Sequence, residues 1–180
     1  METLMDIFIY VVLFCYFASA LLYWGGGKFH NSMAAKAALG LAILGCILHL
    51  AILVMRTALI GVLPLTNGLE FLLSFSWITV LLYLLMQTRY PIQSAAGIVM
   101  LISALLVSLV AILMKDQLGS VAPLMPALKS PWLTVHVVTA AVSYSAFALA
   151  AGLAVVQFFK TGQSIKDDYI YLLVGGGFAL

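Results

Sequence analysis

The sequence predicts an all-α fold, a polytopic bundle of transmembrane helices, and three observations support this prediction. Hydrophobic residues make up 65% of the 180-residue chain and charged residues only 8%, against roughly a quarter charged in soluble domains. The apolar runs are continuous, not alternating, which indicates helices and not the strands of a membrane barrel. Several runs are also about 20 residues long, the length that a helix needs to cross a bilayer core.

Five apolar segments reach this length. The first is too long, and its amino-terminal flank with Glu2 and Asp6 too acidic, to be a cleaved signal peptide. Glu70 opens the third, where the helix dipole favours a carboxylate. A connection punctuated by prolines precedes the fifth. The predicted segments are Asp6–Trp24, Met33–Met55, Gly68–Gln87, Ser94–Met114 and Thr134–Phe159. A sixth apolar run, Tyr169–Leu180, stops before it could cross a membrane, so we expect the chain to be cut within a helix.

The placement of lysine and arginine predicts the orientation of the bundle. Five of the eight cationic side chains lie at the first, third and fifth connections, and three at the second and fourth. Because cytoplasmic loops are enriched in Lys and Arg, the amino terminus and the loops 56–67 and 115–133 are predicted to be extracytoplasmic. The formal net charge of +2 is too small to indicate nucleic-acid binding.

Histidine is the residue here that commonly ligates metals or heme and titrates near neutral pH. His30 lies in a predicted cytoplasmic loop, where a solvated side chain is the default. His49 lies inside the second helix, two turns before Arg56 and on the same face. It is either a functional group within the membrane or a neutral imidazole bonded to a neighbouring helix. Arg56 is either an interfacial anchor or a partner of Glu70 across a short loop, and such a pair would have an architectural role.

His136 stands at the start of the fifth helix, behind Pro131 and Trp132. Proline is well tolerated in a first helical turn, and Trp132 is typical of the membrane–water interface. His136 should therefore lie just under the outer surface, either as a passive interface residue or as a ligand. Cys15 and Cys46 lie in apolar runs without a CxxC or CxxCH motif, so two buried, unreactive thiols are expected.

Two stretches resemble the CcsA/ResC cytochrome c biogenesis family. The segment Pro126–His136, PALKSPWLTVH, which continues to Ser143-Tyr144, is similar to the stretch around the family's first external heme-ligating histidine. The segment Pro64–Phe71, PLTNGLEF, which leads to Ser76-Trp77, is similar to the family's loop of proline, asparagine and glutamate, with Leu69 in place of a commoner aromatic residue. His49 and Arg56 also stand where the family usually has them.

The resemblance implies that residues 1–180 are one transmembrane domain, the amino-terminal part of a longer cytochrome c assembly domain in a bacterial inner membrane or a thylakoid-type membrane. It implies that heme b, as a transported substrate, is held at the outer face between two histidines and joined there to the CxxCH motif of apocytochrome c. His136 would be one axial ligand of the heme iron, with Trp132 beside it. Possible secondary residues are His49, Arg56, Asn67 and Glu70.

The implied partners are a CcsB/ResB-like membrane protein, apocytochrome c, heme and the lipid bilayer, but not nucleic acid. In the family the second external histidine and a tryptophan-rich heme-binding segment come after the point that corresponds to Leu180. The resemblance therefore implies that the full-length protein with its partner is a cytochrome c synthase, and that this chain alone is inactive.

Two other functions stay open from the residues themselves. One is a b-type electron-transfer subunit in which His49 and His136 clamp a single heme. The other is a non-heme small-molecule transporter or structural subunit. The many small residues of the fifth segment allow close helix packing and fit either function.

Overall fold

The computed structural model describes residues 2–29, 32–120, 130–159 and 167–180, and within these ranges it contains helices but no strand. The α-helices are α1 Glu2–Phe29, α2 Ser32–Ile60, α3 Gly68–Met86, α4 Ala96–Leu113, α5 Pro131–Phe159 and α6 Asp167–Ala179. Two short 3₁₀ turns, η1 Gln93–Ala95 and η2 Lys115–Gln117, flank α4.

The predicted fold class is confirmed. The helices α1 to α5 are long and apolar enough to cross a membrane, and α6 covers the sixth apolar run. Phe14, Ile112 and Phe158 are 68%, 76% and 78% exposed, and a lipid environment accommodates such large apolar side chains without cost. Five such spans with an apolar surface show an integral membrane protein, in which each helix satisfies its own backbone hydrogen bonds.

Several predicted boundaries differ from the structure. The first helix is longer at both ends than the predicted segment Asp6–Trp24, since α1 spans Glu2–Phe29. The sequence predicts a loop from Arg56 onward, but α2 continues to Ile60 because the charge of Arg56 is paired inside the protein. The helix ends where Gly61 adopts a left-handed φ of 76°. The fifth helix begins at Pro131, earlier than predicted, since a proline without an N–H fits a first helical turn. The loop 56–67 therefore shortens to 61–67, and the loop 115–133 ends at residue 130.

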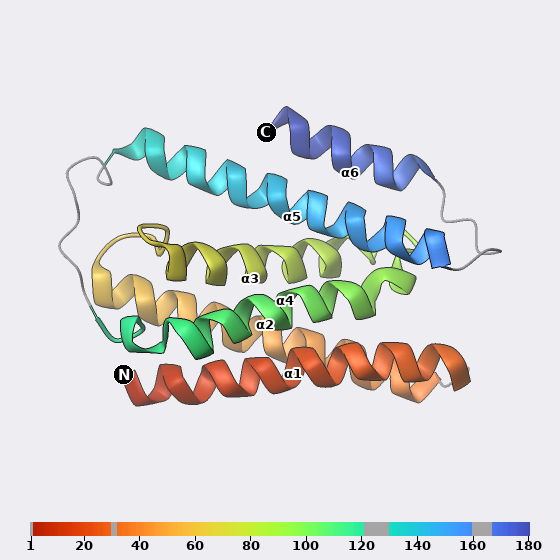
Figure 1. Cartoon of the computed structure of the whole chain (residues 1–180), viewed down its shortest axis with the longest axis horizontal. Coiled ribbons are helices and arrows are strands. Elements are labelled where there is room, and N and C mark those ends of the chain that lie inside the picture. The colour runs from red at the N-terminus through yellow and green to blue at the C-terminus, as the bar shows by residue number, and fades with distance from the viewer. Residues whose placement is uncertain (1, 30–31, 121–129, 160–166) are drawn as a thin grey trace.

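Successive long helices run antiparallel (Figure 1). The helices α1, α3 and α5 begin at one end of the bundle, where α2 and α4 finish. We call this the His136 end. The 61–67 loop, η2 and the start of α5 all lie at this end. The side of the membrane that this end faces stays a prediction.

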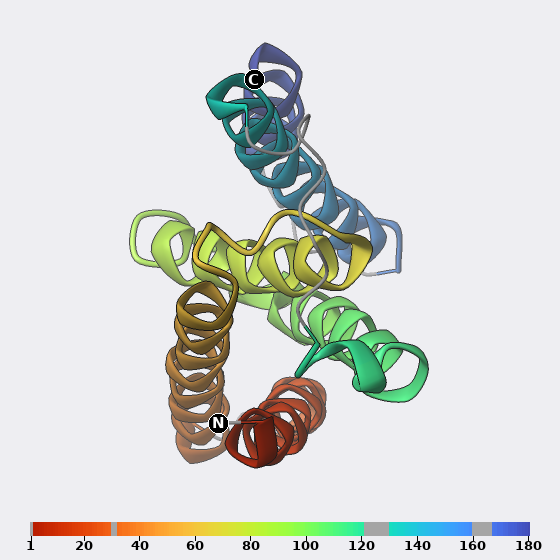
Figure 2. The same ribbon diagram turned by 90° about the vertical axis from the view of Figure 1, so that its left-hand side faces the viewer.

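Seen along the helices, the bundle is arranged with α1 and α2 at one side, α3 and α4 in the middle, and α5 and α6 at the other side (Figure 2). The packing between α1 and α2 is close, because a Cβ atom added at Gly45 would lie 2.7 Å from the ring of Tyr16. Cys15 and Cys46 are both free and buried in this part of the bundle.

Hydrogen bonds between helices accompany this packing. The hydroxyl of Ser76 donates to the carbonyl of Ser103 at 3.1 Å, which joins α3 to α4. The hydroxyls of Thr79 and Ser145 lie 3.1 Å apart and join α3 to α5. Small polar side chains of this kind commonly connect membrane helices. The bond between Thr79 and Ser145 fixes the middle of α5 on α3.

Candidate functional site

The start of α5 presents Trp132 and His136 on one exposed strip. The carbonyl of Ser130 accepts the first helical hydrogen bond, from the backbone N–H of Leu133 at 3.1 Å. Pro131 occupies a position where no N–H is needed. Trp132 is 82% exposed and His136 is exposed as well. Because the two side chains stand one helical turn apart, they share a face of the helix. We call it the Trp132–His136 strip.

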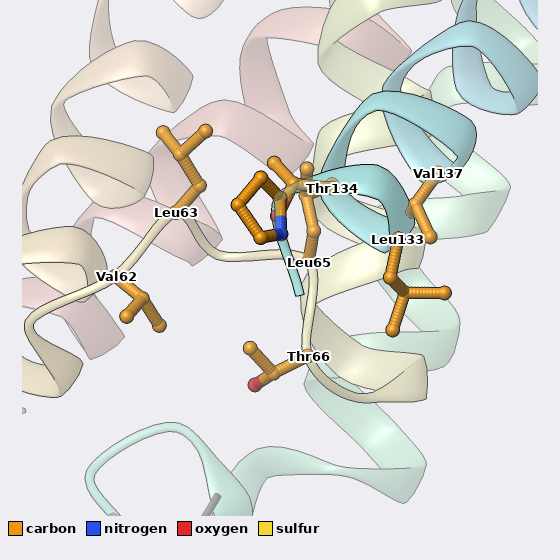
Figure 3. A pocket seen from close by; sticks show the side chains of 8 residues that line it. Val62, Leu63, Leu65, Thr66, Leu133, Thr134 and Val137 are labelled. Carbon is orange, nitrogen blue, oxygen red and sulfur yellow. The ribbon is translucent and has the colours of Figure 1, made fainter. Parts of the chain in front are cut away.

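An adjacent face of α5 and the 61–67 loop together line a pocket of about 190 Å³. Figure 3 shows loop side chains on one side of the pocket and the first two turns of α5 on the other. The lining is apolar except for two threonines and consists of Val62, Leu63, Leu65, Thr66, Pro131, Leu133, Thr134 and Val137. The start of α5 is thus half-buried on the face that lines the pocket and open on the other.

Aromatic packing joins α3 to α5 farther along α5 than this pocket. Tyr144 stands edge-on to Phe71 and Phe75, with ring centroids 6.3 Å and 6.4 Å apart. Edge-to-face pairs of this kind stabilise by about 0.5–1.5 kcal/mol beyond the area that they bury. They hold α5 against α3 while the Trp132–His136 strip stays open.

A buried ion pair joins α2 to α3 at the His136 end. The side chains of Arg56 and Glu70 are 2% and 0% exposed, and Nη2 of Arg56 lies 3.0 Å from Oε1 of Glu70. Nε of Arg56 donates to the same oxygen at 3.1 Å. Nη1 donates to two backbone carbonyls beyond α4, those of Leu118 at 2.7 Å and Ser120 at 2.8 Å. A buried charge is tolerable when it is paired and hydrogen-bonded in this way.

The carboxylate of Glu70 also holds the 61–67 loop. Its Oε2 accepts hydrogen bonds from the backbone N–H of Thr66 at 2.8 Å and from its hydroxyl at 2.7 Å. Asn67 caps α3 by accepting the N–H of Glu70 at 2.9 Å, and its Nδ2 donates to Oε1 at 3.3 Å. This exchange is a variant of the capping box. The hydroxyl of Ser74 donates to the carbonyl of Pro64 at 3.0 Å. Arg56, Glu70 and Asn67 therefore form one connected cluster.

His49 lies elsewhere, fully buried between α1 and α2. Its Nδ1 is 3.2 Å from the hydroxyl of Tyr16, which fits the interpretation of an imidazole bonded to a neighbouring helix. Its Nε2 has no hydrogen-bond partner within the described residues. The helix α3 stands between α2 and α5 (Figure 2), so the structure does not bring His49 and His136 together. The fold gives no support to a heme clamped between them.

Other charged and metal-binding candidates are few at this end. Lys115 is exposed, and its Nζ lies 3.7 Å from the carboxylate of Asp6. That carboxylate, more than the nearby Tyr10, raises the pKa of Lys115, which therefore stays positively charged at neutral pH.

In the described part of the chain no group of three or more His, Cys, Asp or Glu side chains could hold a metal ion. Several histidine, proline and lysine residues of the predicted connections lie outside the described residues. They are His30, Pro123, Pro126, Lys129, Lys160 and Lys166.

Sequence reasoning missed the carbonyls of Leu118 and Ser120 and the hydroxyl of Thr66 as partners in the cluster. Every residue carries a backbone carbonyl, so no pattern of side chains could have indicated the first two. A signal for Thr66 was present, because the spacing of Asn67 and Glu70 is that of a capping box. It places the Glu70 carboxylate beside the residues that precede the helix.

Comparison with known proteins gives a consistent set of similarities. Residues 65–170 match the family described as Cytochrome C assembly protein. The chain is 31% identical to cytochrome c biogenesis protein CcsA of Nostoc punctiforme over 153 residues, which is 83% of this chain and 43% of the relative. It is 30% identical to CcsA of a Picosynechococcus species over 169 residues, 92% of this chain and 49% of the relative. The chain spans about half the length of the curated relatives that it matches. No solved structure matches it.

Proposed function

This chain belongs to the family of cytochrome c assembly proteins, and on that premise we propose that it presents heme at the His136 end of the bundle for attachment to apocytochrome c. His136 is the proposed axial ligand of the heme iron. The observation that supports this role most directly is the exposure of His136 beside Trp132 on an open face of α5. The buried polar side chains nearby are engaged with one another, whereas this imidazole is accessible.

The residue types at the strip suit heme as a substrate. An imidazole nitrogen binds heme iron, and the surroundings of that ligand set the redox potential of the iron. The indole of Trp132, one turn away, offers a flat apolar surface for the porphyrin. The rim of a membrane suits a molecule with apolar vinyl groups and anionic propionates. Lys115 supplies a positive charge at the same end of the bundle.

The function of the longer protein follows from the same proposal. The His136 end faces the extracytoplasmic side of a bacterial inner or thylakoid-type membrane, and heme b is the substrate presented there. Each cysteine S–H of a CxxCH motif adds across one heme vinyl group, which forms a C–S bond with no atom lost. A CcsB/ResB-like membrane protein is the proposed partner, and the two together act as a cytochrome c synthase.

Heme titration of the purified chain in lipid nanodiscs tests the ligand assignment. We expect His136→Ala to weaken heme binding by at least about tenfold, since even residues that only support a ligand cost 10–100-fold in metal affinity. Added imidazole should restore binding, because the free base replaces the missing side chain. Val135→Ala, a neighbour that is 56% exposed, is the matched control and should bind like wild type. Unchanged heme affinity in His136→Ala would refute the assignment.

A chimera tests the role in cytochrome c maturation. In it, this chain replaces the matching segment of the Nostoc punctiforme relative, and covalent heme in c-type cytochromes is measured by heme staining. Maturation should proceed with the wild-type segment and fail with His136→Ala while the chimera accumulates normally. Equal staining from the two chimeras would argue against heme presentation by this residue.

A further inference from the structure

Arg56 connects segments that are far apart in the sequence. Its guanidinium reaches Glu70 at the start of α3 and the carbonyls of Leu118 and Ser120, which are 62 and 64 residues away along the chain. The side chain is 2% exposed, so these contacts are shielded from water. One buried side chain thus fixes the end of α2, the start of α3 and the segment that leaves η2.

Glu70 extends this connection to the 61–67 loop. Its second oxygen holds both the backbone and the hydroxyl of Thr66. Thr66 also lines the pocket against the first turns of α5, opposite Leu133 and Thr134 (Figure 3). The loop wall that faces the start of α5 across the pocket is therefore held by the carboxylate that pairs with Arg56.

We propose that Arg56 is a positioning residue for His136, a role that rests on the proposed function. Through Glu70 it places the 61–67 loop, which shares a pocket with the start of α5, and through the carbonyls of Leu118 and Ser120 it fixes the residues after η2 to the same ion pair. Within the described residues no hydrogen bond joins the first two turns of α5 to α3, so on this face the helix start depends on the loop side chains across the pocket.

The geometry of the contacts explains why arginine serves here and lysine would not. A guanidinium has five N–H donors in a rigid planar fork, whereas an ammonium is a compact point charge. Arg56 uses Nε and Nη2 for the carboxylate and Nη1 for the two carbonyls. A lysine could keep the charge pair with Glu70, but its single nitrogen could not reach both directions. Arg56→Lys therefore weakens the hold on Glu70, since one nitrogen replaces the two that contact Oε1, and it releases the 118–120 segment while the buried charge stays balanced.

The test compares Arg56→Lys with Arg89→Lys, the same substitution at an exposed arginine at the opposite end of the bundle. Heme binding to the full chain is titrated in nanodiscs with and without imidazole. We expect Arg56→Lys to lose about tenfold in heme affinity, the lower end of the range for residues that orient a metal ligand. Imidazole should restore the binding, because the free base replaces a misplaced ligand, and Arg89→Lys should bind like wild type.

Three results would overturn the proposal. They are wild-type affinity and absorption spectrum in Arg56→Lys, an equal loss in Arg89→Lys, and a loss in Arg56→Lys that imidazole does not restore. The last would show a general folding defect instead of a displaced ligand. Thr66→Val is the milder second variant, since it removes the hydroxyl bond to Glu70 but keeps the side-chain size. It should show a smaller loss of affinity that imidazole also restores.

A measurement without heme separates this proposal from the proposed function. Spin labels at Gln117→Cys and Val135→Cys, two exposed positions, report the distance between η2 and the start of α5 once Cys15 and Cys46 are replaced by alanine. Arg56→Lys should broaden that distance distribution, and Arg89→Lys should not. If the distribution broadens but His136→Ala still binds heme normally, the heme assignment fails and the positioning stands. An unchanged distribution in Arg56→Lys would overturn the positioning.

Discussion

Two regions at the His136 end use polar residues in opposite ways. In the cluster of Arg56, Asn67 and Glu70, the ionised side chains are almost fully buried and each is paired. On the Trp132–His136 strip, an imidazole and an indole are exposed. The polar side chains of the cluster are hydrogen-bonded to other groups of the protein, whereas the side chains of the strip are accessible to another molecule.

This difference teaches how to separate structural from functional polar residues in a membrane protein. An ionisable residue within a membrane segment is a functional candidate by default, and Arg56, Glu70 and His49 all qualify from sequence. Burial and bonding divide them from His136. A group whose partners are all internal specifies the arrangement of helices, and a group that is accessible at the membrane rim can bind a substrate. The contrast predicts that substitutions in the two regions affect different measurements.

The largest expected effect on the free energy of unfolding comes from removing one partner of the ion pair between Arg56 and Glu70. Glu70→Leu leaves the buried guanidinium of Arg56 without its counter-charge, and removal of one partner of such a pair typically costs about 3–5 kcal/mol. The free energy of unfolding, measured by denaturant titration in detergent micelles, should fall by that amount. The double variant Arg56→Met/Glu70→Leu should recover part of the loss, since no buried charge remains. A single variant as stable as wild type would contradict the structural role of the cluster.

A smaller effect is expected at the cap of α3. Asn67→Ala removes the acceptor for the backbone N–H of Glu70, and loss of a helix cap costs about 1 kcal/mol. Asn67→Asp sharpens the comparison because it keeps the cap acceptor but replaces the Nδ2 donor with a negative charge beside Glu70. If the cap alone matters, the aspartate variant should match wild type in thermal unfolding. If the connected cluster matters, as we expect, it should also be destabilised.

His49 provides an intermediate case, because it is buried but singly bonded. Tyr16→Phe removes the hydroxyl that lies 3.2 Å from Nδ1, and hydrogen bonds between membrane helices contribute about 0.6 kcal/mol on average. Tyr144→Phe, at a ring that is 51% exposed, is the matched control and should leave the free energy of unfolding unchanged. A loss in Tyr16→Phe as large as that in Glu70→Leu would place His49 in a network that the described residues do not reveal.

The fold was largely predictable because a membrane restricts the alternatives. Continuous apolar runs of sufficient length must be helices, so composition and run length determined the order and number of spans. The boundaries at Arg56 and Pro131 were less predictable. A charge normally ends an apolar segment, and only the partners supplied by Glu70 and by two distant carbonyls let α2 continue. Those partners depend on tertiary packing, which run length does not contain.

The candidate site was predictable only in part. The pairing of Arg56 with Glu70 followed from charge and short sequence separation, and it is present. Exposure of His136 was expected from its place behind Pro131 and Trp132, and the helix start and burial agree with it. The link from Arg56 to Leu118 and Ser120 was not predictable, because the acceptors are backbone groups. Ligation of heme by His136 stays a prediction that requires the binding experiment.

The smallest expected effect is also the one that separates the two regions most directly. His136→Ala should change the free energy of unfolding by no more than about 0.5 kcal/mol, since exposed substitutions away from packed features seldom do more. Alanine is in addition a better helix former than histidine. The same variant is expected to lose most heme affinity, so stability and binding should dissociate at this position. A destabilisation approaching that of Glu70→Leu would mean that His136 is held within the protein, and its availability to a substrate would no longer follow from the structure.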